Sequence, residues 1–191
     1  MAHLARYWRA LVGTLTVVAL VLANLFLPGA NSASAHMGAH WRKGGNIYLN
    51  IADYASHRSE AEAAIDNQIQ SISLLYWIRT TDNPDVFVFD GDYGNTGWCG
   101  GAFVNVDGNG HIYGQPQAKY NYSSSQNCNQ GDPWWIQGYF CQEITHTWGQ
   151  GHHNIGGTCM GLGYFDTGVS NVMSPHDNDD FDATYRCHLG C

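Results

Sequence analysis

Basic residues are scarce in this chain. Its 191 residues include eight lysines and arginines against sixteen aspartates and glutamates, a net charge of −8 at pH 7. Two of the basic residues, Arg6 and Arg9, lie in the first 35 residues, which contain no acidic residue, so residues 36–191 carry a net charge of −10. A surface this acidic argues against nucleic acid and against an anionic membrane as binding partners.

A long apolar run occurs at the start of the chain, and no second run of that length follows. Residues 10–27 are almost entirely apolar, follow the two arginines, and precede the small-residue sequence Ala33-Ser34-Ala35. This order is typical of a secretory signal peptide spanning residues 1–35. An uncleaved membrane anchor is the alternative, because the run is almost long enough to span a bilayer. We expect cleavage, which leaves residues 36–191 as a single extracellular domain.

The sequence also lacks a C-x-x-C pair, which argues against a cysteine zinc site. Its six cysteines all follow residue 35: Cys99, Cys128, Cys141, Cys159, Cys187 and Cys191. An even number of cysteines in an oxidising compartment predicts disulfides. Proximity in the sequence favours Cys187–Cys191 and Cys141–Cys159, and Cys99–Cys128 follows by elimination.

The predicted elements have the order of an α+β domain with its sheet in the N-terminal half. Period-two or buried apolar patterns predict strands at residues 46–52, 74–78, 85–89, 102–106, 111–113 and 118–122. A helix is expected from Ser59, which forms an S-x-x-E capping box with Glu62. Residues 107–110, Asp-Gly-Asn-Gly, predict a hairpin turn.

A long helix is predicted from Asp132, the N-cap, with Pro133 at the first helical position. It should end at Gly149. Beyond it, frequent glycines indicate an irregular lobe that ends in a short helix at about residues 179–185. No internal repeat or linker divides residues 36–191.

The candidate catalytic and metal-binding residues lie in one stretch that begins in the long helix. It is Q-E-x-x-H-x-x-G-x-x-H at residues 142–152. It is the long zinc signature H-E-x-x-H-x-x-G-x-x-H with its first histidine replaced by glutamine. Positions i and i+4 share a helix face, so Gln142 and His146 can converge on one point, and a turn at Gly149 can bring His152 to it. Glu143 lies where a carboxylate could take a proton from a metal-activated water.

With these residues the chain resembles the metzincins, the zinc-peptidase clan that includes matrixins and astacins. It most resembles small secreted bacterial members, which have a cysteine before the motif and Thr-Cys-Met after it, here residues 158–160. The resemblance implies a twisted five-stranded sheet with one antiparallel edge strand over the cleft, and an active-site helix. It also implies that Glu143 is the catalytic base and that His146 and His152 bind zinc.

The same resemblance implies a methionine turn beneath the metal. Met160 lies eight residues after His152, a separation like that of matrixins, and is the methionine expected in the turn. Met173 is the alternative, because Pro175 follows closely and favours a turn.

The glutamine at the first ligand position leaves three outcomes open. Gln142 can ligate zinc through its amide oxygen, although zinc prefers histidine nitrogen. Another histidine, His153, His176 or His111, can take its place. Alternatively, the site binds no zinc and the domain is catalytically silent.

The sequence therefore predicts a secreted, monomeric zinc endopeptidase that acts on protein or peptide substrates. The alternative is a metzincin-like binding or structural domain that has lost its metal. Calcium is a second candidate cofactor, because metzincins often carry structural calcium and acidic residues cluster at Asp90, Asp92, Asp177, Asp179, Asp180 and Asp182. Solvated turns and an acidic helix N-terminus explain these clusters equally well.

Overall fold

The structure is a computed structural model, and it describes residues 39–42, 45–51, 55–67, 69, 75–125, 128, 131–161 and 172–186. The expected signal peptide and the expected Cys187–Cys191 disulfide lie outside these residues. All described residues belong to one compact unit, Ser34–Cys191. None of the helices in the described part is long and apolar enough to cross a bilayer.

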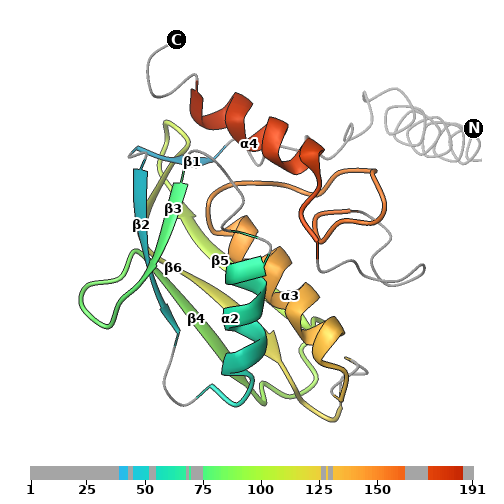
Figure 1. Ribbon diagram of the computed structural model, residues 1–191. Helices are drawn as coiled ribbons and strands as arrows, with labels where there is room; N and C mark the ends of the chain where they lie inside the picture. Colours follow the sequence, from blue (N-terminus) through green and yellow to red (C-terminus); the bar gives the residue numbers. More distant parts are fainter. Residues whose placement is uncertain are drawn as a thin grey trace, which may run out of the picture. The chain divides into compact units, whose positions relative to one another are not determined.

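One mixed sheet forms the body of this unit (Figure 1). Its strands are β1 (His40–Trp41), β2 (Gly45–Ile51), β3 (Leu75–Arg79), β4 (Val86–Gly91), β5 (Gly100–Val106) and β6 (His111–Asn121). The order is β1-β6-β4-β2-β3, with every neighbouring pair parallel, and β5 pairs antiparallel with β6. The described sheet thus has six strands where the resemblance implies five, because the two-residue β1 joins the first residues of β6.

The β5–β6 hairpin confirms the turn predicted at residues 107–110. Asp107 and His111 close it through a backbone bond of 2.9 Å, and Gly110 has a φ of 83° that favours glycine. The strands predicted at 111–113 and 118–122 are one continuous strand. Gly114 and Pro116, which interrupt the sequence pattern, fall where the register of the β5–β6 pair shifts.

Helices α2 (Arg58–Asn67) and α3 (Pro133–His146) pack against each other and against the sheet, α2 on β2 and α3 on β5 and β6 (Figure 1). In α2, Ala61, Ala64 and Ile65 are buried at helical spacing. Strand β4 alternates between buried residues, such as Val86 and Val88, and partly exposed ones. The core therefore lies between the two helices and the sheet.

The capping box predicted for α2 is wrong. The helix begins at Arg58, and the Ser59 hydroxyl bonds to the neighbouring Glu60 at 2.8 Å. Asp90 of β4 takes the capping role, because its carboxylate accepts the N–H groups of Ser56 and His57 at 2.9 and 2.8 Å. A side chain distant in the sequence has replaced the local cap.

Helix α3 begins as the sequence predicts. Asp132 is extended (φ −110°, ψ 108°), its carboxylate accepts the N–H of Trp134 at 2.9 Å, and Pro133 is the first helical residue. The helix ends at His146, earlier than the predicted Gly149. Gly149 still makes the sharp turn, with a φ of 97°.

Two aromatic residues from distant parts of the chain cap the C-terminal end of α3. The Trp41 indole N–H donates to the Thr147 carbonyl at 3.1 Å, and the Tyr185 hydroxyl donates to the Trp148 carbonyl at 2.6 Å. Tyr185 lies on α4 (Pro175–Arg186), which begins earlier than the predicted 179–185 helix. Carbonyls at the end of a helix have no partner within it, so these bonds satisfy groups that would otherwise be buried and unpaired.

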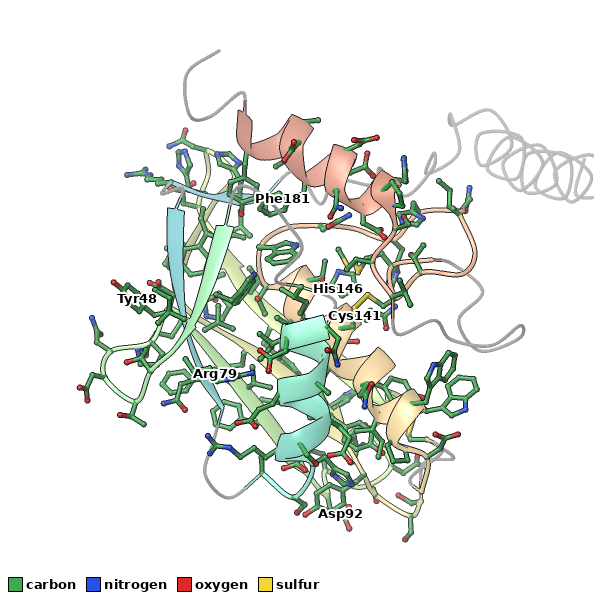
Figure 2. All side chains as sticks on the ribbon, viewed as in Figure 1. Tyr48, Arg79, Asp92, Cys141, His146 and Phe181 are labelled. Atoms are coloured by element: carbon green, nitrogen blue, oxygen red, sulfur yellow. A yellow bond between two sulfur atoms is a disulfide. The ribbon has the colours of Figure 1, made fainter. Side chains whose placement is uncertain are left out.

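Two disulfides join the described cysteines in the predicted pairing. Cys99–Cys128 has an S–S distance of 2.05 Å and Cys141–Cys159 one of 2.07 Å. The second joins α3 to the irregular segment after His152. It lies beside His146 in Figure 2.

Candidate functional site

The side chains of Gln142, His146 and His152 meet at one point, as the spacing of the motif predicts. Gln142 Nε2 lies 2.9 Å from His152 Nε2, and His146 Nε2 lies 3.0 Å from the same nitrogen. The rings of the two histidines meet edge to face, with centroids 4.6 Å apart. Helix α3 supplies the first two side chains, and the turn at Gly149 brings the third.

A hydrogen bond to the backbone fixes the protonation of His146. Its Nδ1 donates to the Gln150 carbonyl at 2.6 Å, so the neutral ring keeps a lone pair on Nε2, the nitrogen that faces His152. Burial, together with the neighbouring His152, lowers the pKa of His146 to about 4. Burial and the neighbouring His153 also lower the pKa of His152. Both rings are therefore neutral near pH 7.

This set of donors fits a transition-metal ion such as zinc. Two nitrogens that bind one zinc in tetrahedral geometry lie about 3.3 Å apart, close to the 3.0 Å between His146 Nε2 and His152 Nε2. Rotation of the Gln142 amide would present Oε1 at the same point. In the described part of the chain, no three or more His, Cys, Asp or Glu side chains are grouped to hold a metal. The candidate set is thus two imidazoles and an amide.

Glu143 is buried against the edge strand β5. Its exposed fraction is 6%, and its carboxylate accepts a hydrogen bond from the backbone N–H of Ala102. Burial raises the pKa of Glu143 to about 8, despite that bond. A Cβ on Gly100 would lie 2.4 Å from Glu143 Oε1, so only glycine leaves room for the carboxylate there. Sequence reasoning missed Gly100, which has no local motif around it.

The three histidines considered as substitutes for Gln142 have other partners. His153 uses both ring nitrogens, Nε2 with the Asp177 carboxylate and Nδ1 as acceptor for the N–H of Ile155 at 3.2 Å. His111 bonds to Asp107 beside the hairpin turn, at 3.2 Å. His176 faces Asp180 on α4, at 3.2 Å. These contacts leave Gln142 as the third member of the site.

The sulfur of Met173 contacts α3. The Sδ atom lies 3.8 Å from the Thr145 hydroxyl and 3.4 Å from Cys159 Sγ. Met160 is also fully buried, and its carbonyl accepts the N–H of His153 at 3.0 Å. Both candidates for the methionine turn are thus buried, and Met173, the alternative, contacts the helix that carries the motif.

Three of the acidic residues considered for calcium bind other groups of the protein itself. Asp90 caps α2, and Asp177 accepts hydrogen bonds from His153 and from Ser174. Asp92 accepts from the Gly94 N–H at 3.0 Å. These contacts assign the three carboxylates to capping and to loop structure.

No family model and no curated protein matches the sequence. The fold is similar to that of myroilysin. The likeness to the crystal structure of myroilysin covers 77% of this chain and 86% of that one, with a TM-score of 0.51 and 9% sequence identity. A likeness at this identity shows the fold alone, so roles for individual residues depend on the geometry above.

Proposed function

We propose that residues 36–191 form a secreted zinc-dependent endopeptidase of the metzincin type. The observation that carries the proposal is the convergence of Gln142, His146 and His152, with Nε2 atoms 2.9 and 3.0 Å apart, next to Glu143. The fold shared with myroilysin, a metallopeptidase, supports the same conclusion. The two disulfides fit an oxidising, extracellular compartment.

His146, His152 and the Gln142 amide oxygen would hold the metal. Zinc, when bound there, would supply a Lewis acid that makes a water molecule acidic. Glu143 then takes the proton from the attacking water and returns it to the leaving amine. A nearby cation lowers the pKa of a carboxyl group, so metal loading would ionise Glu143, whose pKa burial raises to about 8.

The substrate in this proposal is an extended peptide. Strand β5 lies at the edge of the sheet, beside Glu143, and an extended peptide can add to such an edge through backbone hydrogen bonds. The scissile bond would then lie near the carboxylate. In this proposal the protein acts as a monomer.

One observation favours a second candidate, a metal-free binding domain. Gln142 Nε2 can donate a hydrogen bond to His152 Nε2 across the 2.9 Å between them, which joins two members of the site without any cation. The glutamine therefore suits an empty site as well as a weak metal site.

Metal analysis combined with a peptidase assay separates the two functions. Residues 36–191 are purified as wild type, Glu143→Ala and Gln142→His, and are assayed for bound zinc and for cleavage of a fluorogenic peptide mixture. The peptidase proposal expects zinc in the wild type and in Glu143→Ala, with cleavage abolished in Glu143→Ala. Wild-type protein that binds no zinc, and gains zinc and cleavage only in Gln142→His, would establish the metal-free domain instead.

A further inference from the structure

The Gln150 carbonyl, which fixes the tautomer of His146, is itself held in place from α4. The Gln150 side chain donates through Nε2 to the backbone carbonyl of Asp177 at 3.2 Å. Its Oε1 is buried and has no hydrogen-bond partner within the described residues. Within the described residues, the Gln150 side chain therefore makes its hydrogen bond with Asp177 alone.

Asp177 also holds the neighbouring residue of the same segment. Its carboxylate accepts a hydrogen bond from His153 Nε2. Asp177 is fully buried and His153 has an exposed fraction of 5%, so solvent does not weaken this contact. One residue of α4 thus binds the chain on both sides of His152, at Gln150 through its carbonyl and at His153 through its carboxylate.

The first turn of α4 fixes Asp177 in turn. The Ser174 hydroxyl donates to Asp177 Oδ2 at 2.8 Å, and the Ser174 N–H donates to the same oxygen. Both oxygens of the carboxylate are therefore engaged, one by the residue that precedes the helix and one by the segment that carries His152.

We propose that Asp177 and Gln150 are positioning residues that set the tautomer of His146 and place His152. Asp177 acts through Gln150, whose carbonyl accepts the Nδ1 proton of His146 at 2.6 Å and so leaves Nε2 free to bind an electrophile. The tautomer assignment concerns the metal-free protein, whereas its consequence for zinc binding rests on the proposed function.

The physical reason lies in the small energy that separates the two neutral tautomers of imidazole. A buried hydrogen bond is stronger than one in water, so one well-placed carbonyl decides which nitrogen carries the proton. If Gln150 moves, the proton can pass to Nε2 of His146. That nitrogen then has no lone pair to offer a metal.

The matched variants are Gln150→Met, Asp177→Asn and Ser174→Ala. Gln150→Met keeps the buried volume and the backbone carbonyl, and removes the bond to Asp177. Asp177→Asn weakens the contact with His153. Ser174→Ala is the control, because it removes the hydroxyl bond that supports α4 and leaves both contacts between Asp177 and the site segment in place.

Long-range ¹H–¹⁵N NMR spectra of the histidine rings in chelator-treated protein report the tautomer directly. We expect His146 of the wild type and of Ser174→Ala to carry its proton on Nδ1. Gln150→Met should show a mixture or a proton on Nε2, whereas Asp177→Asn, which keeps the backbone carbonyl that Gln150 binds, should keep the Nδ1 proton. An unchanged Nδ1 proton on His146 in folded Gln150→Met overturns the proposal, whatever the behaviour of Asp177→Asn.

Zinc affinity, measured by competition with a chromophoric chelator, gives the second readout. We expect the zinc Kd to rise about 10- to 100-fold in Gln150→Met and Asp177→Asn and to stay within about twofold in Ser174→Ala. If the wild type binds no zinc, the proposed function fails, but the NMR result still decides the positioning role. If the wild type binds zinc and Gln150→Met binds it equally well, the positioning role fails alone.

Discussion

Gly149 lies directly against the backbone of Ala39, so closely that no side chain fits between them. A Cβ on Gly149 would lie 1.8 Å from the Ala39 carbonyl oxygen. Gly149 also has a φ of 97°, which L-residues rarely adopt. The turn that brings His152 to the site therefore depends on the absence of a side chain.

Gly149→Ala should lower the free energy of unfolding by far more than the cost of backbone strain alone. The left-handed conformation costs about 1–2 kcal/mol for alanine, and the clash with Ala39 adds to it. Gly157→Ala is the matched control, because Gly157 has a φ of 81° with open space where a Cβ would be. Unfolding in denaturant measures the free energy of unfolding of both variants. Equal losses of stability in the two variants would show that the Ala39 contact is unimportant.

Tyr185→Phe should lower the free energy of unfolding by about 2 kcal/mol. The change removes the hydroxyl that donates to the Trp148 carbonyl at 2.6 Å and accepts the backbone N–H of Trp41 at 3.2 Å, so two buried hydrogen bonds are lost. Tyr113→Phe is the control, because Tyr113 is 55% exposed. The midpoint of denaturant unfolding should shift in the first variant and not in the second.

Gly100→Ala should impair catalysis more than folding. The new methyl group would lie 2.4 Å from Glu143 Oε1, and the flexible glutamate side chain can move away from it. If Glu143 is the base, as proposed, we expect kcat to fall at least about tenfold as its carboxylate leaves its position, with little change in unfolding. Gly108→Ala, where a Cβ meets no atom within 4 Å, serves as the control. Full activity in Gly100→Ala would argue against Glu143 as the base.

Glu143 should make the metal-free protein less stable as pH rises. Its pKa is about 8 in the folded protein against an ordinary value of 4.5, because burial disfavours the carboxylate. Between these values the folded state holds a proton that the unfolded state has released, so stability falls with increasing pH. Glu143→Gln removes this contribution.

The difference in unfolding free energy between Glu143→Gln and wild type, measured with chelator present, should therefore grow from about pH 5 to about pH 8. His146, whose pKa is lowered, acts in the opposite direction at acidic pH but is present in both proteins, so it cancels. A difference that does not change with pH would contradict the burial of Glu143.

The sequence predicts those parts of the fold that depend on residues close to one another in the sequence. Asp132 and Pro133 start α3 because a cap and its helix are adjacent, and Asp107 and Gly110 close a hairpin within four residues. Ser59 shows the limit of this reasoning. Its capping signal is sound locally, but Asp90, more than thirty residues away, binds the same end of the helix.

The candidate site likewise has parts that the sequence predicts and parts that it does not. The spacing of Gln142 and His146 on one helix predicts their convergence, and the glycine between them and His152 predicts the turn. Gly100 and Asp177 could not be predicted, because each acts on the site from another strand or helix. The choice between Met160 and Met173 likewise depends on tertiary contacts, which the sequence does not show.

The capping of α3 by both Trp41 and Tyr185 has a consequence for the order of assembly. These residues are 144 positions apart and meet through a direct hydrogen bond, so this end of the helix closes only after α4 has docked. Contacts of such long sequence separation form late, because the intervening chain must first be ordered. A nascent chain still without α4 would contain the whole motif and yet lack its final geometry. The final geometry of the candidate site would thus form at the last stage of folding, after synthesis of the C-terminal helix.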